Sequence, residues 1–422
     1  MAVLEYFAKR CDIVLKKTHA ILVLLLVVAT FLIYRAYNVP FGVFDEDAFS
    51  KTIKQLIYLY NGISTFFIVG YLIRSEKDIL LTVRLLLIGG WLALIYSVGE
   101  LALYFGWAPW FGQIDRIVRS NPSFELSTTE VLFGFVPRLH SFAPEQSLAG
   151  FLLILPLSLA FSSSLIRYTS TRRCDRFLAV GLQFFFLFTF SRFSSLVLIL
   201  SLIAIFTISF RLRPRIWVRQ ALILLFIICL HTSGIWLSSA ERARLFPSPW
   251  GTDLSIYTRT VQQTIALQVW GETLWGTGWG LFGYYFPDRV VPYLTADTFE
   301  LWSMAFQNTQ SWVPINNTYL RFLTELGIEG AVLFLLLLIL ILYKSFKALR
   351  LSWKQHNLFI LVGTSSALLA VIAGGMLAEL QTFGLFWFLL AFAELVSDYF
   401  CLNPPRTIPK TNQGRNANAY CN

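Results

Sequence analysis

Three charged residues, Arg321, Glu325 and Glu329, precede a long apolar run in the stretch PINNTYLRFLTELGIEG at 314–330. Their four-residue spacing would align them on one face of a helix. Because charges that enter a membrane are costly, they are expected to be paired, functional or at the interface. Two interpretations stay open. Arg321 and Glu325 neutralise each other and fix this helix against its neighbours, or Glu325 is a general base that Arg321 holds in place.

Arginines form the second group of candidates. From Gly99 to Arg321, the stretches that we assign below to the outer side carry arginine and no lysine. A guanidinium binds phosphate oxygens in a bidentate manner, whereas a lysine acts as a point charge. The set therefore indicates a phosphate-bearing ligand, although any single arginine could instead extend to the membrane interface. The arginines are Arg116, Arg119, Arg138, Arg192, Arg242, Arg244, Arg259, Arg289 and Arg321.

The stretch PRLHSFAPEQSLAG at 137–150 combines a base, an acid and a cation. Pro144 suits the first position of a helix and Glu145 suits its first turn, so a structural explanation accounts for both. It does not account for Arg138 and His140. We interpret Arg138 as a candidate pyrophosphate clamp and His140 or Glu145 as a candidate acid or base, while an ordinary interfacial histidine stays open for His140.

Two more arginines stand where helices are expected to begin. Arg192 follows Ser191 at the tip of a predicted helical hairpin, and a turn requires small polar residues but not arginine. Arg259 lies in the first turn of a stretch in which Val261 and Ile265 continue a four-residue apolar repeat. That repeat predicts an amphipathic helix lying on the membrane.

Aromatic residues surround the glycine-rich sequence that follows this helix. Trp275, Trp279 and Tyr284 could provide platforms for sugar rings, and Asn316 and Asn317 could add amide contacts to a glycan. Tryptophan and tyrosine also populate any membrane interface, so that explanation stays open.

An acidic cluster, FDEDAF at 44–49, offers the alternative of a metal-dependent reaction. It contains Asp45, Glu46 and Asp47, and the competing interpretation is a solvated loop. Since no group of histidines and cysteines has the spacing of a transition-metal site, we predict no metal and no other cofactor.

The elements that must position these residues are transmembrane helices. Of the 422 residues, 56% are hydrophobic and 14% are charged, whereas a soluble protein carries roughly a quarter charged residues. The fold class we predict is all-α, a polytopic integral membrane protein that forms a single domain over 1–422. About 20 apolar residues cross a bilayer as a helix. By this criterion ten spans are expected, at 19–37, 52–72, 79–103, 145–165, 177–191, 193–210, 218–238, 322–343, 357–377 and 380–398.

Basic residues in the short loops set the orientation of these spans. Most of the 34 lysines and arginines fall on one side, which predicts that both termini are cytoplasmic. The net charge of +10 is explained by this collar and does not indicate nucleic-acid binding. Long outer loops are predicted at 104–143 and, between helices 7 and 8, at 239–315, and loops of this length are usually functional. The tail at 399–422 is predicted to be flexible.

The order of these motifs resembles the superfamily of O-antigen polymerases and O-antigen ligases of the bacterial envelope. The residues that carry the resemblance are R-x-H-S-F-x-P-E, S-R at a hairpin tip, Y-x-R before G-T-G-W-G, and N-N-T-Y-L-R-F-L-T-E-L-G-I-E-G before a long apolar helix. The similarity covers roughly residues 130 to 345.

The resemblance implies a GT-C-like, metal-independent, inverting glycosyltransferase in the bacterial inner membrane, with its active site facing the periplasm. Its substrates would be undecaprenyl-pyrophosphate-linked oligosaccharides as donor and acceptor, held among membrane lipids, and a chain-length regulator protein would be a further partner. The arginines that match those engaging the pyrophosphate in the family are Arg138, Arg192 and Arg259, and we add Arg321.

One departure from the family distinguishes two reactions. Ligases, which transfer glycan to lipid A core, typically have a histidine before the penultimate long helix, where this chain has Asn316. A neutral amide cannot act as a base, so the sequence favours a polymerase, with a ligase as the alternative. A second alternative is a flippase or transporter of lipid-linked oligosaccharides. Transporters usually show internal repeats and paired broken helices, which we do not find in the sequence.

Overall fold

The computed structural model describes most of the chain as helices. The residues that it describes are 16–39, 47–118, 131–132, 136–137, 139, 141, 146–166, 172–189, 191–212, 225–229, 231–233, 254–295, 298–307, 313–352, 357–380 and 384–402. Within this part of the chain, the only strands are β1 (Val131–Leu132) and β2 (Val136–Pro137), which form one short antiparallel pair. The predicted all-α class is confirmed.

The long apolar helices match the predicted ranges closely. They are α2 (Lys17–Phe31) continued by η1 (Leu32–Asn38), α3 (Ala48–Leu72), α4 (Glu76–Tyr104), α6 (Gln146–Ile166), α7 (Arg172–Phe188), α8 (Arg192–Leu212), α13 (Thr318–Leu351), α14 (Leu358–Gly374) and α15 (Gly384–Leu402). The predicted span at 218–238 lies mostly outside the described residues.

Several of these helices are suited to crossing a membrane. In the described part of the chain, five are long and apolar enough, and two shorter apolar helices, Arg192–Ile208 and Leu358–Gly374, accompany them. The five are Lys17–Tyr37, Glu76–Tyr104, Ala149–Ile166, Thr318–Leu351 and Gly384–Leu402. The membrane class of the protein is therefore supported by its helices, while the number of ten spans stays a prediction.

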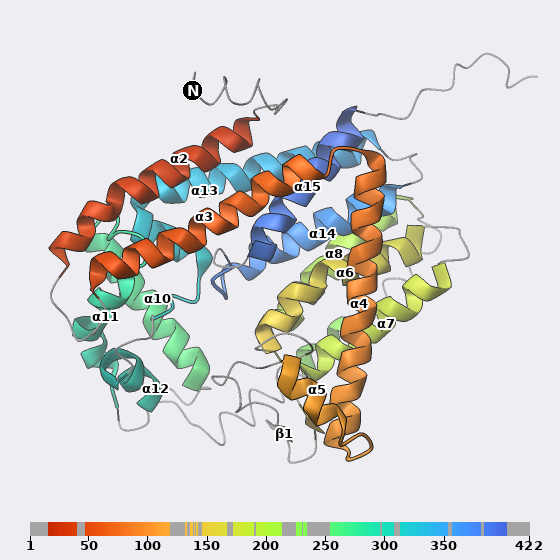
Figure 1. Ribbon diagram of the computed structural model, residues 1–422, viewed down its shortest axis with the longest axis horizontal. Coiled ribbons are helices and arrows are strands. Elements are labelled where there is room, and N and C mark those ends of the chain that lie inside the picture. Colours follow the sequence, from red (N-terminus) through yellow and green to blue (C-terminus); the bar gives the residue numbers. More distant parts are fainter. Residues whose placement is uncertain are drawn as a thin grey trace, which may run out of the picture.

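The long helices pack in two groups (Figure 1). Helices α2, α3, α13 and α15 contact one another, and α6, α7, α8 and α14 form the second group, with α4 against α6 and α7. Helix α14 joins the groups because it also contacts α13 and α15. Small residues allow the closest approaches. A Cβ on Gly150 of α6, for example, would lie 2.8 Å from the Cα of Ser194 in α8.

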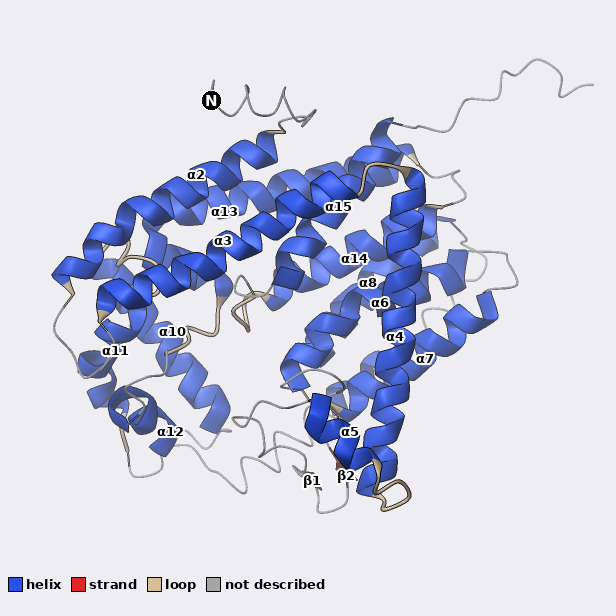
Figure 2. Ribbon diagram, in the orientation of Figure 1, coloured by secondary structure: helices blue, strands red, loops and turns tan. Residues whose placement is uncertain are grey.

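The loop predicted at 239–315 contains its own small helical assembly. Its elements are α10 (Leu254–Glu272), α11 (Phe282–Val290), η4 (Val291–Tyr293), α12 (Phe299–Trp302) and the π-helical turn η5 (Ser303–Gln307), all coloured as helix in Figure 2.

The amphipathic helix predicted in this loop is present as α10, and protein covers much of its apolar face, while its position on the membrane stays a prediction. Val261, Ile265 and Val269 are at most 1% exposed and pack in one cluster with Phe282 and Phe286. The four-residue repeat predicts an apolar face correctly. It cannot reveal whether lipid or a later part of the same loop covers that face.

The loop predicted at 104–143 also contains a helix, α5 (Phe111–Val118). Phe111 is 7% exposed and packs on Gly99 of α4, while the hydroxyl of Tyr96 donates a hydrogen bond to Asp115 (2.5 Å). These contacts fix α5 against the C-terminal end of α4.

Candidate functional site

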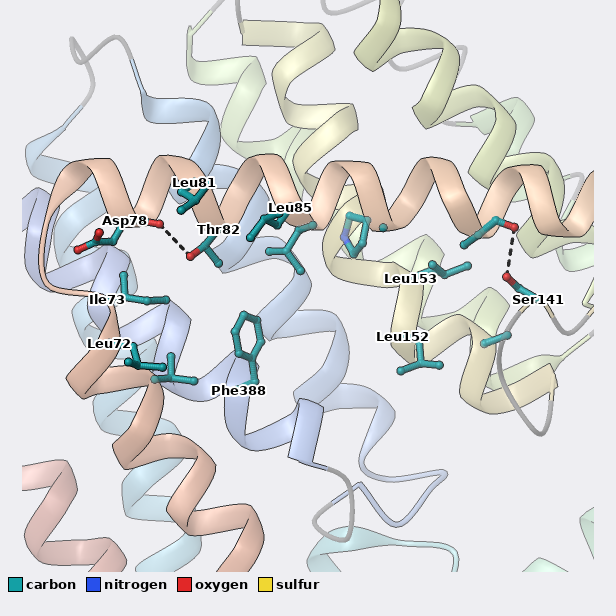
Figure 3. Close-up of a pocket in the computed structure, with 16 residues that line it drawn as sticks. Leu72, Ile73, Asp78, Leu81, Thr82, Leu85, Ser141, Leu152, Leu153 and Phe388 are labelled. Atoms are coloured by element: carbon teal, nitrogen blue, oxygen red, sulfur yellow. Dashed lines mark hydrogen bonds between the residues drawn. The ribbon is translucent and has the colours of Figure 1, made fainter. Parts of the chain in front are cut away.

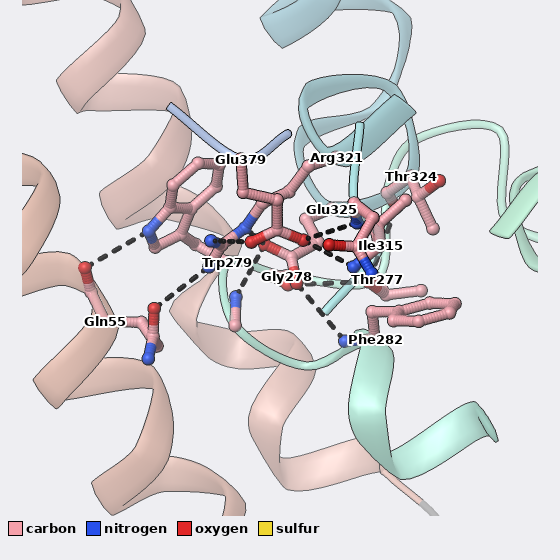
Figure 4. Close-up of polar contacts among 12 residues, drawn as sticks. Gln55, Thr277, Gly278, Trp279, Phe282, Ile315, Arg321, Thr324, Glu325 and Glu379 are labelled. Carbon is pink, nitrogen blue, oxygen red and sulfur yellow. Dashed lines mark hydrogen bonds and ion pairs between the residues drawn. The ribbon is translucent and has the colours of Figure 1, made fainter. Parts of the chain in front are cut away.

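A buried guanidinium forms the centre of the most elaborate polar network in the described residues (Figure 4). The side chain of Arg321, near the start of α13, is 0% exposed. It donates from Nε to Glu325 (3.0 Å), from Nη1 to Glu379 (2.9 Å) and from Nη2 to the side-chain oxygen of Gln55 (2.9 Å). Its guanidinium carbon lies 4.6 Å from the ring centroid of Trp279, within the range of a cation–π contact.

Each carboxylate of this network is also held by backbone N–H groups. Glu325 is 0% exposed and accepts from the N–H of Gly280 (2.9 Å). Glu379 accepts from the N–H of Ile315 and from the N–H of Asn316 (3.3 Å). Such hydrogen bonds compensate buried charge.

The network contains one cation, Arg321, and two carboxylates, Glu325 and Glu379. Burial and, to a smaller extent, the charge of Glu325 raise the pKa of Glu379 to about 7, although Arg321 acts in the opposite direction. Arg321 carries a single positive charge, so full ionisation of both acids leaves an excess negative charge in a dry environment.

The glycine-rich loop after α10 is joined to α13 by its backbone. Gly327 has a φ of +69° and interrupts the helical geometry of α13. This break exposes backbone groups to the loop: the N–H of Thr277 donates to the carbonyl of Thr324 (3.0 Å), and that of Gly278 to the carbonyl of Glu325 (2.9 Å). Gly276 has a φ of +87°, and a Cβ there would lie 2.5 Å from the nitrogen of Gly327. Glycine is therefore required on both sides of the contact.

The paired interpretation of Arg321 and Glu325 matches this geometry. The ion pair links α13 to α3 through Gln55 and to the segment after α14 through Glu379. A substrate hydroxyl would reach the carboxylate of Glu325 only after the surrounding loop had moved, since no part of its side chain is exposed. The role of Glu325 as a base stays a prediction.

The two predicted glycan-binding asparagines also have structural partners. Asn317 is the N-cap of α13, and its side-chain oxygen accepts from the N–H groups of Tyr319 (3.0 Å) and Leu320 (3.1 Å). Asn316 has a φ of +55°, a conformation that asparagine tolerates better than most residues. Its Nδ2 donates to Gln262 of α10 (2.6 Å), so it joins the helical assembly of residues 254–307 to α13.

The three predicted aromatic platforms differ in accessibility. Trp275 is 62% exposed, whereas Trp279 is 1% and Tyr284 is 9% exposed. The indole N–H of Trp279 donates to the backbone oxygen of Gln55 (3.1 Å). In this arrangement a sugar ring could stack on Trp275 but would not reach Trp279.

A second cluster joins one of the predicted clamp arginines, Arg192, to the helix that carries another, Arg259. Arg192 is the first residue of α8, and its Nη2 donates to the hydroxyl of Ser255 in the first turn of α10 (3.4 Å). Ser255 and Arg259 are four residues apart on α10 and so share a face of that helix. Residues separated by 63 positions, Arg192 and Ser255, thus come into contact.

Sequence reasoning missed His231, which lies beside this cluster. Its Nδ1 is 3.4 Å from the hydroxyl of Ser195, one turn after Arg192, and its side chain is 2% exposed. In the sequence, His231 is a single histidine within the apolar span predicted at 218–238. A single histidine in such a span gives no sign of whether its role is structural or functional.

Three of the predicted residues, Arg138, His140 and Glu145, lie outside the described part of the chain. Two described residues of the same stretch have clear partners. The N–H of Leu139 donates to the carbonyl of Phe188 at the end of α7 (3.0 Å), and the N–H of Ser141 donates to Glu100 of α4 (2.9 Å).

Helix α14 connects the two clusters. The N–H of Thr318, at the start of α13, donates to the carbonyl of Gly375 (2.7 Å). On the other side, a Cβ on Gly374 would lie 2.8 Å from the ring of Phe193 in α8. The first turns of α8 and α13 therefore flank the same end of α14.

The acidic cluster at 44–49 is only partly described. Asp47 is the N-cap of α3 and accepts from the N–H of Ser50 (3.1 Å), which gives it a structural role. Asp45 and Glu46 lie outside the described residues.

Comparison with known proteins adds no assignment. No family model matches the chain, and no curated protein matches it.

Proposed function

We propose that this protein is a glycosyltransferase of the bacterial inner membrane that polymerises lipid-linked oligosaccharide repeat units. It transfers a glycan from undecaprenyl pyrophosphate to the terminal sugar of another lipid-linked unit at the periplasmic face. The observation that carries the proposal is the hydrogen bond from Arg192 to Ser255 in the first turn of α10, one turn before Arg259 on the same helix. Two guanidinium groups at the outer end of apolar helices suit a lipid pyrophosphate.

The arginines would act on the leaving group. The acceptor hydroxyl attacks the anomeric carbon, the bond from that carbon to the pyrophosphate oxygen breaks, and the configuration inverts. Negative charge develops on the departing pyrophosphate, where pre-placed guanidinium groups stabilise the transition state. Because the leaving group is already activated, no nucleotide is needed at the periplasmic face, and the resemblance to the polymerase and ligase superfamily implies a reaction without metal.

The hydroxyl proton passes to a base of the outer side. His140 and Glu145 remain the candidates for this role, with Glu325 as a third that requires movement of the glycine-rich loop. The amide of Asn316 donates a hydrogen bond to Gln262 and has no basic atom, which favours polymerisation over ligation to lipid A core. The proposed topology has ten spans in a GT-C-like arrangement and both termini in the cytoplasm.

The reaction is tested by deleting the gene and separating the cell's lipopolysaccharide on a gel. A polymerase predicts a single repeat unit on the core. Bare core with accumulated lipid-linked polymer would indicate a ligase instead, and unchanged glycan would exclude both.

The arginine cluster is tested by complementing the deletion with Arg192→Ala and Arg259→Ala. We expect each variant to lower polymer formation by about 100-fold, as for the loss of one transition-state donor. Arg289→Ala is the matched control, because Arg289 is also on the outer side but pairs with Glu272, which is 58% exposed. Full activity of both variants at normal membrane levels would refute the clamp.

A further inference from the structure

A long apolar cavity of about 610 Å³ lies between α4, α6, the end of α3 and α15 (Figure 3). One wall is a single face of α4 that includes Leu85, Gly89 and Ala93. The opposite wall includes Leu152 and Pro156 of α6 and Phe388 of α15. The lining is almost entirely aliphatic or aromatic, so the cavity fits an apolar ligand.

The cavity extends along the length of a membrane-crossing helix. Its lining on α4 runs from Asp78 to Ala93, which corresponds to about 22 Å at 1.5 Å per residue. The hydrocarbon core of a bilayer is about 30 Å thick. A long, thin chain lying along the membrane normal therefore matches the cavity better than a compact ligand.

The two ends of the cavity differ. Asp78 stands at the end near the α3–α4 turn, which the predicted topology places on the inner side, and its carboxylate accepts from the N–H groups of Arg74 (3.1 Å) and Ser75 (2.9 Å). That carboxylate would repel a phosphate. Ser141 stands at the opposite, outer end. Two residues before it, Leu139 is bonded to Phe188, close to the hairpin tip that carries Arg192.

We propose that this cavity binds the polyisoprenoid chain of the lipid-linked substrate, with the pyrophosphate at its outer end. The inference rests on the proposed function, because that function supplies a ligand with one long apolar chain and a phosphate headgroup. The cavity follows one face of α4 from Asp78 to Ala93, and this narrow, elongated shape favours a single chain over a two-chain phospholipid.

Gly89 provides a way to fill the cavity without disturbing the fold. A Cβ at Gly89 meets no atom within 4 Å, whereas a Cβ at the neighbouring Gly90 would lie 3.1 Å from Pro156. Gly89→Phe would place a ring in the cavity. The matched control is Ile88→Phe, since Ile88 is 54% exposed and does not line the cavity.

Binding is measured on the purified full-length protein by native mass spectrometry with undecaprenyl phosphate as the probe. We expect Gly89→Phe to weaken binding at least tenfold and Ile88→Phe to leave it unchanged. Equal binding by Gly89→Phe and the wild type would overturn the assignment of this cavity. Competition by phosphatidylglycerol at the same concentration would show a general lipid site and would overturn the isoprenoid assignment.

The assay separates this inference from the proposed reaction. If gene deletion leaves the cell's glycans unchanged while Gly89→Phe still abolishes binding of undecaprenyl phosphate, the polymerase proposal fails and the cavity assignment stands. If deletion shows a polymerase while Gly89→Phe binds normally, the chain binds elsewhere.

Discussion

Arg321 shows how a single residue can organise several segments of a membrane protein. Its guanidinium contacts side chains from α3, α13 and the segment after α14, and it lies on the ring of Trp279. The fork of donors in arginine suits three acceptors at once, whereas lysine would satisfy them only as a point charge.

Removal of this guanidinium should therefore destabilise the protein strongly. We expect Arg321→Ala to lower the free energy of unfolding by about 3–5 kcal/mol, because it leaves buried carboxylates without a cation. Arg321→Lys should recover only part of the loss. Thermal unfolding in detergent measures both variants, and Arg289→Ala should change stability by no more than about 1 kcal/mol as an exposed pair. A loss of similar size in the Arg289 variant would contradict this ranking.

The second acid of the network predicts a pH dependence. The pKa of Glu379 is raised from 4.5 to about 7 in the folded protein, so the folded state holds this proton more tightly than the unfolded state does. Its contribution to stability is complete below pH 4.5 and is lost as the pH rises through about 7.

The check compares melting temperature with pH for the wild type and Glu379→Gln. The wild type should become less stable over this window, and the variant should lose most of that dependence because glutamine does not titrate. Glu272→Gln serves as the control, since Glu272 is largely exposed. Identical pH profiles for the Glu379 variant and the wild type would exclude Glu379 as the titrating group.

At the scale of elements, the contact between the glycine-rich loop and α13 depends on two glycines. A Cβ on Gly327 would lie 2.5 Å from the carbonyl carbon of Trp275, and the positive φ of Gly327 is unfavourable for other residues. We expect Gly327→Ala to cost at least about 1–3 kcal/mol of stability. In contrast, Gly271→Ala should be neutral or stabilising, because a Cβ at Gly271 meets nothing within 4 Å and the position is helical. Unfolding measurements that rank the two variants in the opposite order would contradict the structure.

The positions of the long helices could be predicted from the sequence because a long apolar segment admits few alternatives. The helices inside the two long loops, predicted at 104–143 and 239–315, could not be placed in the same way. The repeat of Val261, Ile265 and Val269 predicts a helix, but its partners Phe282 and Phe286 come from a later turn of the chain.

The candidate site was predictable to a similar degree. The spacing of Arg321 and Glu325 indicated their pairing, which the structure contains. The participation of Glu379 and Gln55 could not be inferred, since they are separated from Arg321 by 58 and 266 positions. The buried position of Trp279 was equally hidden, because an aromatic residue in an outer loop resembles a ligand platform whether or not another element covers it.

For the whole molecule, the predicted topology places the helical assembly that begins with α10 in the periplasm and the C-terminal end of α13 in the cytoplasm. We expect a cysteine introduced at Gln268, which is exposed on α10, to react with a membrane-impermeant maleimide in intact cells of a cysteine-free background. A cysteine at Lys347, near the other end of α13, should react only after lysis. The reverse pattern would invert the orientation that the basic loops predict.

The network around Arg321 also has a consequence for how the chain is made. A ribosome synthesises Gln55 and Trp279 before Arg321, but Glu379 follows 58 residues later. When α13 first enters the bilayer, its arginine can pair with Glu325 on the same helix, while the acid that ties it to the second helical group does not yet exist. The network closes only when the connection between α14 and α15 has been translated, so correct docking of α13 is completed late in biogenesis. A nascent chain that ends after α14 would hold this helix by one ion pair in place of two.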